Sequence, residues 1–388
     1  MRRLFPLLAG VLALETSLFA AVAPLLPHYS QEYDLSKAEA GILLAAYPAG
    51  TLLASLPSGW IVVRRGPKQM LLASLVLFAA ASVSFAFAER SPVLDIARFL
   101  QGVAGAGLWA AGMAWLAAES PRDRLGEVIG AALGVGIVGI LFGPAIGGVA
   151  SAIGPQIVFT AIAVLAGALA LGAVQLPAHA SNAHLTMALL VAAIRTRTVL
   201  TGFWLFMLPA VFAGVIEVLE PLRLAGFGTS GPLIGAVFVI AALVEAVVSP
   251  AAGRLSDRRG RAVPLRAGLA TAVVIALLLP LPRAALPAAA CVVLAFAALG
   301  MCWAPAMAFL SDAADGANLP FAMTFSLANV AWATGHMLGA AGGAPLAGHF
   351  SDAVPYFLVA GLCLLTLLVP LRARPSFARR QRAREATH

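Results

Sequence analysis

The sequence predicts an all-α membrane protein with twelve transmembrane helices arranged as two pseudo-symmetric six-helix bundles. Three observations predict this fold. About a dozen apolar stretches are each close to the roughly 20 residues that a helix needs to cross a bilayer. Hydrophobic residues make up 61% of the 388 residues and charged residues only 11%, a balance that soluble domains do not show. A short pattern of glycine and arginine also occurs once in each half of the chain.

The apolar stretches predict the spans in order. They cover 4–27, 37–62, 68–88, 92–118, 127–150, 155–176, 199–222, 232–252, 263–282, 286–310, 319–343 and 354–371. Twelve spans leave about 32 residues for each span and its loop, so no soluble domain of ordinary size fits. Residues 177–198 are polar and form the longest internal loop. We interpret them as a cytoplasmic linker between an amino-terminal bundle, residues 1–176, and a carboxy-terminal bundle with a basic tail, residues 199–388.

The basic residues predict the orientation of the chain in the membrane. If the spans alternate, 20 of the 25 Lys and Arg residues lie on one side: Arg2, Arg3, Arg64, Arg65, Lys68, Arg122, Arg124, Arg195, Arg197, Arg254, Arg258, Arg259, Arg261, Arg266 and the six arginines of 372–384. The positive-inside rule then places both termini in the cytoplasm. The net charge of +8 is thus a topology signal, and we expect no nucleic-acid partner. The first apolar run also resembles a signal peptide, but its removal would leave an odd number of spans.

The glycine and arginine pattern follows the second and the eighth spans. The copies lie 194 residues apart (253 − 59 = 194) and contain Gly59, Arg64 and Gly66 in the first, and Gly253, Asp257, Arg258, Gly260 and Arg261 in the second. The second copy resembles the G-x-x-x-D-R-x-G-R signature of the major facilitator superfamily, and the resemblance covers essentially the whole chain. It implies a loop that gates the cytoplasmic side, in which Asp and Arg link neighbouring helices.

The two copies of the gating loop predict different partners. Asp312 and Asp315, after the tenth span, are candidate acceptors for Arg258. In the first copy Val63 takes the place of the Asp, so Arg64 and Arg65 would have to pair with Glu119 or Asp123. The alternative interpretation is that these cations only set the topology.

The fourth span contains Arg98, the only cation in the body of a predicted span. Residues 98–106 resemble the R-x-x-Q-G-x-G-A pattern of proton-coupled members of the superfamily. The resemblance implies that Arg98 biases the protonation of a neighbouring acid or holds an anionic substrate group, because a buried arginine is costly and needs a partner. In the alternative, Arg98 extends toward the outer surface and pairs with Asp95 one turn earlier.

The fifth span is rich in glycine at helical spacing. Its end resembles the motif that is typical of antiporters in the superfamily, and the residues concerned are Gly139, Gly143, Pro144, Gly147 and Gly148. Such a face lets helix backbones pack closely. Ordinary glycine packing between membrane helices is the alternative interpretation.

The first span supplies the candidate proton carrier, Glu15, near the middle of the bilayer. Pro24 and Pro27 follow it in a pattern similar to the D-x8-P-x-x-P of tetracycline and multidrug proton antiporters, with Glu for Asp. Burial disfavours the carboxylate and a nearby Arg98 favours it, and this opposition suits proton exchange. Glu15 could instead be a protonated residue that only hydrogen-bonds between helices.

Further intramembrane residues are candidates for the proton site or the substrate cavity. Glu217 and Glu245 lie deep in the seventh and eighth spans, whereas Glu220 lies near the surface and can pair with Arg223. His336 could titrate, but a histidine that is satisfied by packing is the favoured interpretation. Tryptophans in several spans either line a cavity or pack, and the sequence does not distinguish the two.

These features together predict a proton-coupled exporter of drugs or small metabolites that works by alternating access, and not an enzyme. The sequence contains no nucleotide-binding loop and no cluster of metal ligands, and its three cysteines lie in apolar runs, so we expect no cofactor, metal or disulfide. The expected partners are a small-molecule substrate, protons and the lipid bilayer of a bacterial inner membrane, with the protein as a monomer. A symporter or uniporter for a small metabolite or anion is the first alternative, and a non-transporting membrane sensor the second.

Overall fold

A computed structural model of the chain describes residues 3–120, 124–177, 196–317, 319 and 321–369. These residues form twelve helices and no strand: α1 (Leu4–Glu32), α2 (Lys37–Arg65), α3 (Pro67–Ala86), α4 (Ser91–Glu119), α5 (Leu125–Ile153), α6 (Pro155–Val174), α8 (Arg197–Gly226), α9 (Gly231–Arg259), α10 (Ala262–Leu278), α11 (Ala285–Gly316), α12 (Phe321–His349) and α13 (Ala353–Leu368). Within the described residues, nine helices are long and apolar enough to cross a membrane, and α10 and α13 are shorter apolar helices.

Each predicted span corresponds to one helix. The helices mostly extend beyond the apolar core of the span, because polar residues continue the helix into the interface. α1 runs past Pro24 and Pro27 to Glu32, and α11 runs to Gly316, beyond the predicted end at 310. α8 begins at Arg197, just inside the predicted linker. Residues 178–195 of the linker and the basic tail from residue 370 lie outside the described residues.

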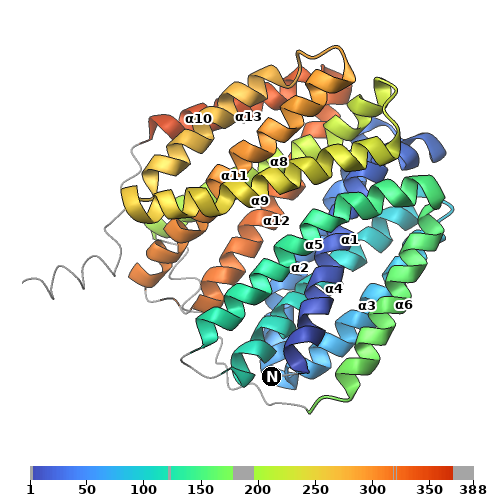
Figure 1. Ribbon diagram of the computed structural model, residues 1–388, viewed down its shortest axis with the longest axis vertical. Coiled ribbons are helices and arrows are strands. Elements are labelled where there is room, and N and C mark those ends of the chain that lie inside the picture. Colours follow the sequence, from blue (N-terminus) through green and yellow to red (C-terminus); the bar gives the residue numbers. More distant parts are fainter. Residues whose placement is uncertain (1–2, 121–123, 178–195, 318, 320, 370–388) are drawn as a thin grey trace, which may run out of the picture.

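The twelve helices form two bundles of six with the same internal packing. In the amino-terminal bundle, α1 packs along α5 and α2 along α4, while α3 lies against α4 and α6. The carboxy-terminal bundle repeats this arrangement: α8 packs along α12, α9 along α11, and α10 lies against α11 and α13. The equivalent pairings give the pseudo-symmetry that the repeated loop pattern predicted (Figure 1).

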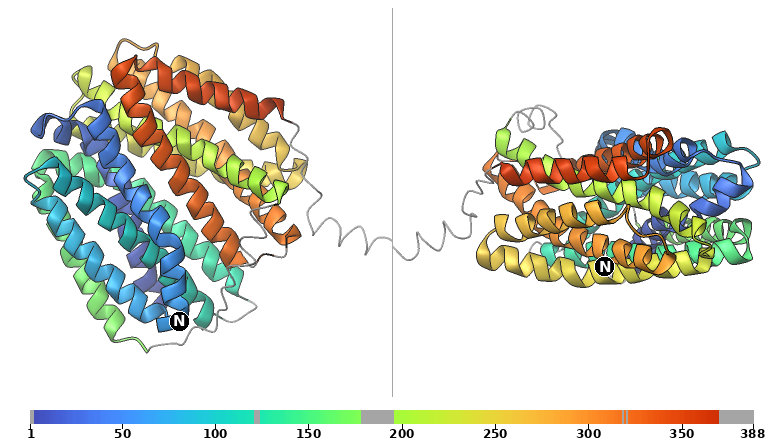
Figure 2. Two further views of the ribbon diagram at one scale, coloured as in Figure 1. Left: turned by 180° about the vertical axis from the view of Figure 1, so that it is seen from behind. Right: turned by 90° about the horizontal axis from the view of Figure 1, so that it is seen from above.

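The two bundles approach each other at one end of the molecule and diverge toward the end where the N-terminus lies (Figures 1 and 2). The diverging end carries most of the described Lys and Arg residues, including Arg64, Lys68, Arg124, Arg197 and Arg258, and we call it the basic end. We call the other the opposite end. Contact between the bundles runs chiefly along two helix pairs, α2 with α12 and α5 with α9.

Close contacts between the bundles gather at the opposite end. Gly41 of α2 lies so near α12 that a Cβ atom there would meet the Ala344 side chain and the Ala340 carbonyl. Lys37, at the start of α2, forms an ion pair with Asp352, which precedes α13, with a distance of 2.5 Å between Nζ and Oδ1. The second helix pair meets at Gly148 of α5 and Gly235 of α9. The bundles are therefore closed against each other at this end.

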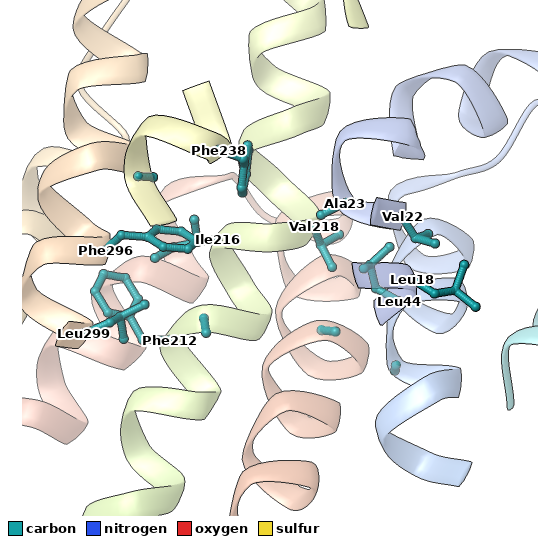
Figure 3. Packing of buried hydrophobic residues seen from close by; sticks show 14 of the residues in the cluster. Leu18, Val22, Ala23, Leu44, Phe212, Ile216, Val218, Phe238, Phe296 and Leu299 are labelled. Atoms are coloured by element: carbon teal, nitrogen blue, oxygen red, sulfur yellow. The ribbon is translucent and has the colours of Figure 1, made fainter. Parts of the chain in front are cut away.

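Most buried apolar side chains form one cluster that reaches into both bundles (Figure 3), and a second, smaller cluster in the carboxy-terminal bundle includes Val199, Leu310 and Leu327. Leu18 and Val22 of α1 lie on one side of the larger cluster, and Phe212 and Ile216 of α8 on the other. All three cysteines of the sequence lie in the carboxy-terminal bundle and are free: Cys291, Cys302 and Cys363. The apolar core surrounds a small number of buried polar groups, and these define the candidate site.

Candidate functional site

Glu15 lies in the interior of the amino-terminal bundle, and only 3% of it is exposed. Its carboxylate accepts two hydrogen bonds from other helices. The Tyr47 hydroxyl of α2 donates to Oε1, and the Trp109 indole N–H of α4 donates to Oε2 at 2.8 Å. Gly105 makes room for this arrangement, because a Cβ atom there would meet both Tyr47 and Glu15. The buried carboxylate is thus held by two donors and not by a direct ion pair.

Arg98 is fully buried beside this carboxylate. Its Nη1 donates to the Leu18 carbonyl at 3.3 Å and to Oε1 of Gln101 at 3.1 Å, and its Nη2 donates to the Phe19 carbonyl at 2.7 Å. The guanidinium also lies 4.6 Å from the centre of the Tyr47 ring, within the range of a cation–π interaction. The alternative in which Arg98 reaches the surface and pairs with Asp95 is therefore wrong.

The carboxy-terminal bundle contributes an acid and a histidine at the same level. Nε2 of His336 on α12 lies 3.0 Å from Oε2 of Glu217 on α8, and His336 is 2% exposed. Phe19, from α1 of the other bundle, contacts two rings of α12: its ring centre lies 5.5 Å from that of His336 and 5.1 Å from that of Trp332. The rings of Phe19 and Tyr47 are also in contact, with 5.1 Å between their centres, so an aromatic chain joins the two bundles.

Four of the predicted residues therefore come together at the interface between the bundles. Arg98 is close enough to Glu217 and Glu15 for both carboxylates to interact with its charge. Glu245 lies on α9 and faces α11. On α11, Trp303 is in hydrogen-bonding position to the Glu245 carboxyl, and Gly300 leaves room for its side chain. Glu245 is also close enough to Glu217 for the two charges to interact.

Glu220 does not belong to this group. It is fully buried nearer the opposite end, where the Tyr356 hydroxyl donates to it at 2.6 Å. The predicted partner Arg223 is present, with 3.6 Å between Nη1 and Oε1 of Glu220. The Arg223 guanidinium also donates to the carbonyls of Leu279, Pro280 and Pro282 after α10. These contacts anchor the α8 end and favour a structural role.

The second gating loop forms an ion-pair network, but with a different arginine from the one predicted. Arg261, not Arg258, binds the predicted acceptor: its Nε lies 3.0 Å from Oδ2 of Asp312, and its Nη1 donates to Asp257. Gly260 has φ +92°, which turns the chain after α9 and directs Arg261 back onto α11. Arg258 remains on the exposed face of the last turn of α9, without an ion pair to the described residues.

The environment of Arg261 favours its charged form. Burial alone lowers the pKa of the guanidinium, but the hydrogen bonds and charges of Asp312 and Asp257 outweigh that effect, and the pKa of Arg261 is raised. The loop between α9 and α10 is therefore tied to the end of α11 by a permanent cation.

The first gating loop has no equivalent network among the described residues. Gly66 repeats the backbone of Gly260 with φ +86°, but Arg64 lies over the ring of Trp60, 4.0 Å from its centre. Gly59 also lies in α2, a little more than one turn before Arg64. Asp123, one of the predicted acceptors, lies outside the described residues. The Lys68 ammonium donates to the carbonyls of Val174 and Leu176, which ties α3 to the end of α6 instead.

The glycine motif of α5 faces two different helices. Cβ atoms at Gly139, Gly143 and Gly147 would each meet the backbone of α1, within the same bundle. Gly148 instead lies against Gly235 and Pro232 of α9, in the other bundle. The motif therefore serves both the packing of one bundle and the contact between the two.

The sequence model of the Major Facilitator Superfamily matches residues 8–325 and 218–388 of the chain. The chain belongs to this superfamily. Its members are membrane transporters and not enzymes, which agrees with the predicted fold and with the absence of an enzyme motif in the sequence.

Individual relatives match shorter parts of this superfamily member. The MFS-type transporter ppzB of Metarhizium rileyi is 28% identical over 137 residues, which cover 34% of this chain and 28% of that protein. The putative multidrug resistance protein MdtD of Klebsiella pneumoniae is 33% identical over 124 residues, 32% of this chain and 26% of MdtD. The quinolone resistance protein NorA of Staphylococcus aureus is 27% identical over 128 residues, a third of each chain. The matches span only about a third or less of these relatives.

Solved structures share the fold over almost the whole chain. A D-xylose-proton symporter superposes with a TM-score of 0.75 and 16% identity, over 95% of this chain and 97% of that one. A bacterial homologue of the human lysosomal transporter Spinster, in an inward-facing and occupied conformation, superposes with a TM-score of 0.77 and 14% identity, over 96% and 98%. At these identities the likeness concerns the fold alone.

Two residues of the site, Tyr47 and Phe19, were not singled out from the sequence of this transporter, and Trp109 was only one of the tryptophans left open between lining a cavity and packing. Tyr47 and Trp109 bind Glu15 from helices that are distant in the chain, and no short motif indicates such contacts. Phe19 had a usable signal: it lies four residues after Glu15 on α1, and helical spacing places the two on one face.

Proposed function

We propose that this member of the superfamily is a proton-coupled antiporter that exports small organic molecules by alternating access. The arrangement of Arg98 carries the proposal. It is fully buried, its Nη atoms already donate to protein acceptors, and it is close enough to Glu15 and Glu217 for its charge to interact with both. Both Nη atoms are thus engaged by the protein, and only Nε lacks a partner among the described residues. A two-point hydrogen bond to an anionic substrate would have to displace these contacts, whereas the charge of the guanidinium acts on both acids without any rearrangement. This favours proton coupling over the symporter or uniporter alternative in which Arg98 binds substrate.

The orientation follows from the charge distribution. We infer that the basic end and both termini lie in the cytoplasm, because Lys and Arg concentrate in cytoplasmic loops. The bundles close at the opposite end through Gly41, Gly148 and the Lys37–Asp352 ion pair, so the conformation corresponds to an inward-facing state. In that state the site would take up substrate from the cytoplasm, as export requires.

The coupling would use competition between a proton and the substrate. In the inward-facing state Glu15 gives its proton to the cytoplasm and substrate binds at the interface between the bundles. After the bundles rock to the outward-facing state, a proton from outside neutralises Glu15 and the substrate leaves. Differential binding to the two states then drives the exchange. Glu217, His336 and Glu245 would form a second cluster of polar side chains on the other side of the same interface.

The substrate class and the location rest on relatives. Two relatives carry multidrug and quinolone resistance in their names, which favours drug-like organic substrates. These two relatives are bacterial, and we propose a bacterial inner membrane as the location. We also propose a monomer, because one chain supplies both bundles.

The test measures proton release from detergent-solubilised protein on addition of ethidium, tetraphenylphosphonium or a fluoroquinolone. We expect at least one probe to release protons from the wild type and none to do so from Glu15→Gln. The matched control is Glu127→Gln, which alters an exposed glutamate on α5 that pairs with Arg124 and should release protons like the wild type. Probe binding without proton release in the wild type would contradict the antiporter and favour the uniporter or sensor.

A further inference from the structure

The amino-terminal bundle consists of two helix pairs. Within each pair the backbones are in direct contact. Cβ atoms at Gly143 and Gly147 of α5 would meet the backbone of α1, and one at Gly102 of α4 would meet the Tyr47 carbonyl of α2. Across the pairs, α1 touches α2 and α4 at few residues. The α1–α5 pair and the α2–α4 pair are therefore each tightly packed, with a looser seam between them.

Each pair contacts a different part of the carboxy-terminal bundle. The α1–α5 pair meets α9 through Gly148, which lies against Gly235. The α2–α4 pair meets α12 through Gly41, which lies against Ala340. If the two helix pairs shift relative to each other, the α5–α9 contact and the α2–α12 contact therefore also shift relative to each other.

Polar contacts across the seam gather at one carboxylate. Glu15, on α1, accepts from Tyr47 and Trp109, which both belong to the α2–α4 pair. Arg98 of α4 adds hydrogen bonds to the backbone carbonyls of Leu18 and Phe19 on α1. Of these hydrogen bonds, only those from Tyr47 and Trp109 change with the charge of Glu15, because the carbonyls that accept from Arg98 do not titrate.

We propose that Tyr47 is a positioning residue. Together with Trp109, it links the protonation state of Glu15 to the relative position of the two helix pairs on either side of the seam. A carboxylate accepts from both donors at once. A protonated carboxyl has an O–H donor, and its hydroxyl oxygen is a much weaker acceptor than a carboxylate oxygen, so the hydrogen bond from one of the two donors is weakened unless that donor reverses its role. Tyr47 can reverse by accepting, whereas the indole of Trp109 cannot. The proposal rests on the proposed function, since it takes Glu15 as the proton site.

Other charged groups lie around Glu15 and have to be considered. Arg98 of α4 is the charged group that acts on Glu15 directly. Glu217 of α8 acts on Arg98 in turn and contacts His336 of α12, which packs against Phe19. The test therefore compares a Tyr47 variant with a Glu15 variant, so that a response from the other groups is recognised as such.

The experiment follows the separation of the bundles at the basic end by electron paramagnetic resonance between pH 5.5 and 8.5, without substrate. Spin labels at Gln69→Cys and Arg266→Cys occupy exposed positions on α3 and α10, in a background with the three native cysteines replaced by alanine. We expect the wild type to change its distance distribution with pH and Glu15→Gln to lose that change. In Tyr47→Phe, which keeps the ring over Arg98, we expect the midpoint to move by about one pH unit toward higher pH, because the carboxylate loses a charge-assisted hydrogen bond.

Tyr33→Phe is the matched control, because its hydroxyl donates to the Ala88 carbonyl and not to an acid. A Tyr47→Phe profile that coincides with those of Tyr33→Phe and the wild type would overturn the role of Tyr47 while leaving Glu15 as the proton site. A wild-type response that Glu15→Gln does not abolish would overturn both this proposal and the proposed function. If Tyr47→Phe does not fold, Trp109→Phe removes the other donor to Glu15. An unchanged midpoint in that variant would equally contradict the proposed link between Glu15 and the two helix pairs.

Discussion

His336 and Glu217 form a buried contact between α12 and α8, with 3.0 Å between Nε2 and Oε2, and the ring of Phe19 from the other bundle packs against the histidine. The carboxy-terminal bundle thus has its own buried carboxyl and imidazole side chains close to Arg98. Unlike Glu15, which joins two helix pairs, this contact lies inside one pair, because α8 packs along α12.

We expect His336 and Glu217 to act as a unit. His336→Gln and Glu217→Gln should each lower the rate of probe transport in proteoliposomes, and the double variant should be no slower than the slower single variant, with a coupling of about 0.5–3 kcal/mol. The matched control is the exposed pair of His28 and Glu32, which lie 3.2 Å apart. Substitutions there should have small and additive effects on the transport rate. Additive losses at the buried pair would show that the two residues act independently.

Arg98 should be important for stability as well as for coupling. Arg98→Ala removes the donor to the Leu18 and Phe19 carbonyls and leaves Glu15 without a nearby cation, so we expect a loss of about 3–5 kcal/mol. The apparent Tm is measured with a thiol-reactive dye, which reports unfolding because Cys302 is buried. Arg90→Ala, at an exposed position before α4, should change stability by less than about 0.5 kcal/mol. An equal Tm for the two variants would contradict the prediction.

The ion pair of Lys37 and Asp352 should favour the conformation closed at the opposite end. Both side chains are about two-fifths exposed, so we expect the pair to contribute about 0.5–1 kcal/mol. Lys37→Ala should therefore shift the population about 2–5-fold toward closure at the basic end, measured with the same label pair. The charge exchange Lys37→Asp with Asp352→Lys should restore the wild-type distribution, and its failure to do so would argue against a direct pair.

The network at the second gating loop predicts different effects for neighbouring arginines. Asp312→Asn leaves Arg261 with a neutral acceptor, and we expect stability to fall by about 1–2 kcal/mol. Arg258→Gln changes an exposed side chain and should have an effect within about 0.5 kcal/mol. Thermal unfolding of the two variants side by side decides whether Arg261 or the Arg258 of the signature holds the loop.

The glycines of α5 should differ in their tolerance of a methyl group. A Cβ atom at Gly147 would meet the Ala21 carbonyl, so Gly147→Ala should cost about 1–3 kcal/mol by forcing α1 and α5 apart. A Cβ atom at Gly134 of the same helix would have no neighbour within 4 Å, and Gly134→Ala should be neutral. Equal apparent Tm values for the two variants would rule out the close α1–α5 contact.

The fold was predictable because it depends on regular features of the sequence. Span length and loop charge indicated twelve helices, and each predicted span has its helix, with differences only at the ends. Helix ends were less certain, since the polar residues that follow an apolar core can extend a helix into the interface. The proline-containing end of α1 illustrates this, because the helix continues to Glu32.

The site was predictable only where a residue was unusual in itself. An intramembrane acid or arginine is costly, so Glu15, Arg98 and Glu217 stood out without knowledge of their neighbours. Tyr47 is an ordinary membrane residue, and its importance arises from a contact with Glu15 across two helices. The prediction chose Arg258 where the structure has Arg261, and the cause is local, since the turn at Gly260 decides which side chain faces α11.

The contact of Gly148 with Gly235 affects how the opposite end can open. Because backbone meets backbone there, no layer of flexible side chains separates α5 from α9. A passage lined by long side chains can widen by degrees as rotamers change, but this junction has nothing to rearrange. We therefore expect the opposite end to behave as a two-position switch, either shut or parted by a rigid displacement of whole helices, with no partly open intermediate held by side chains.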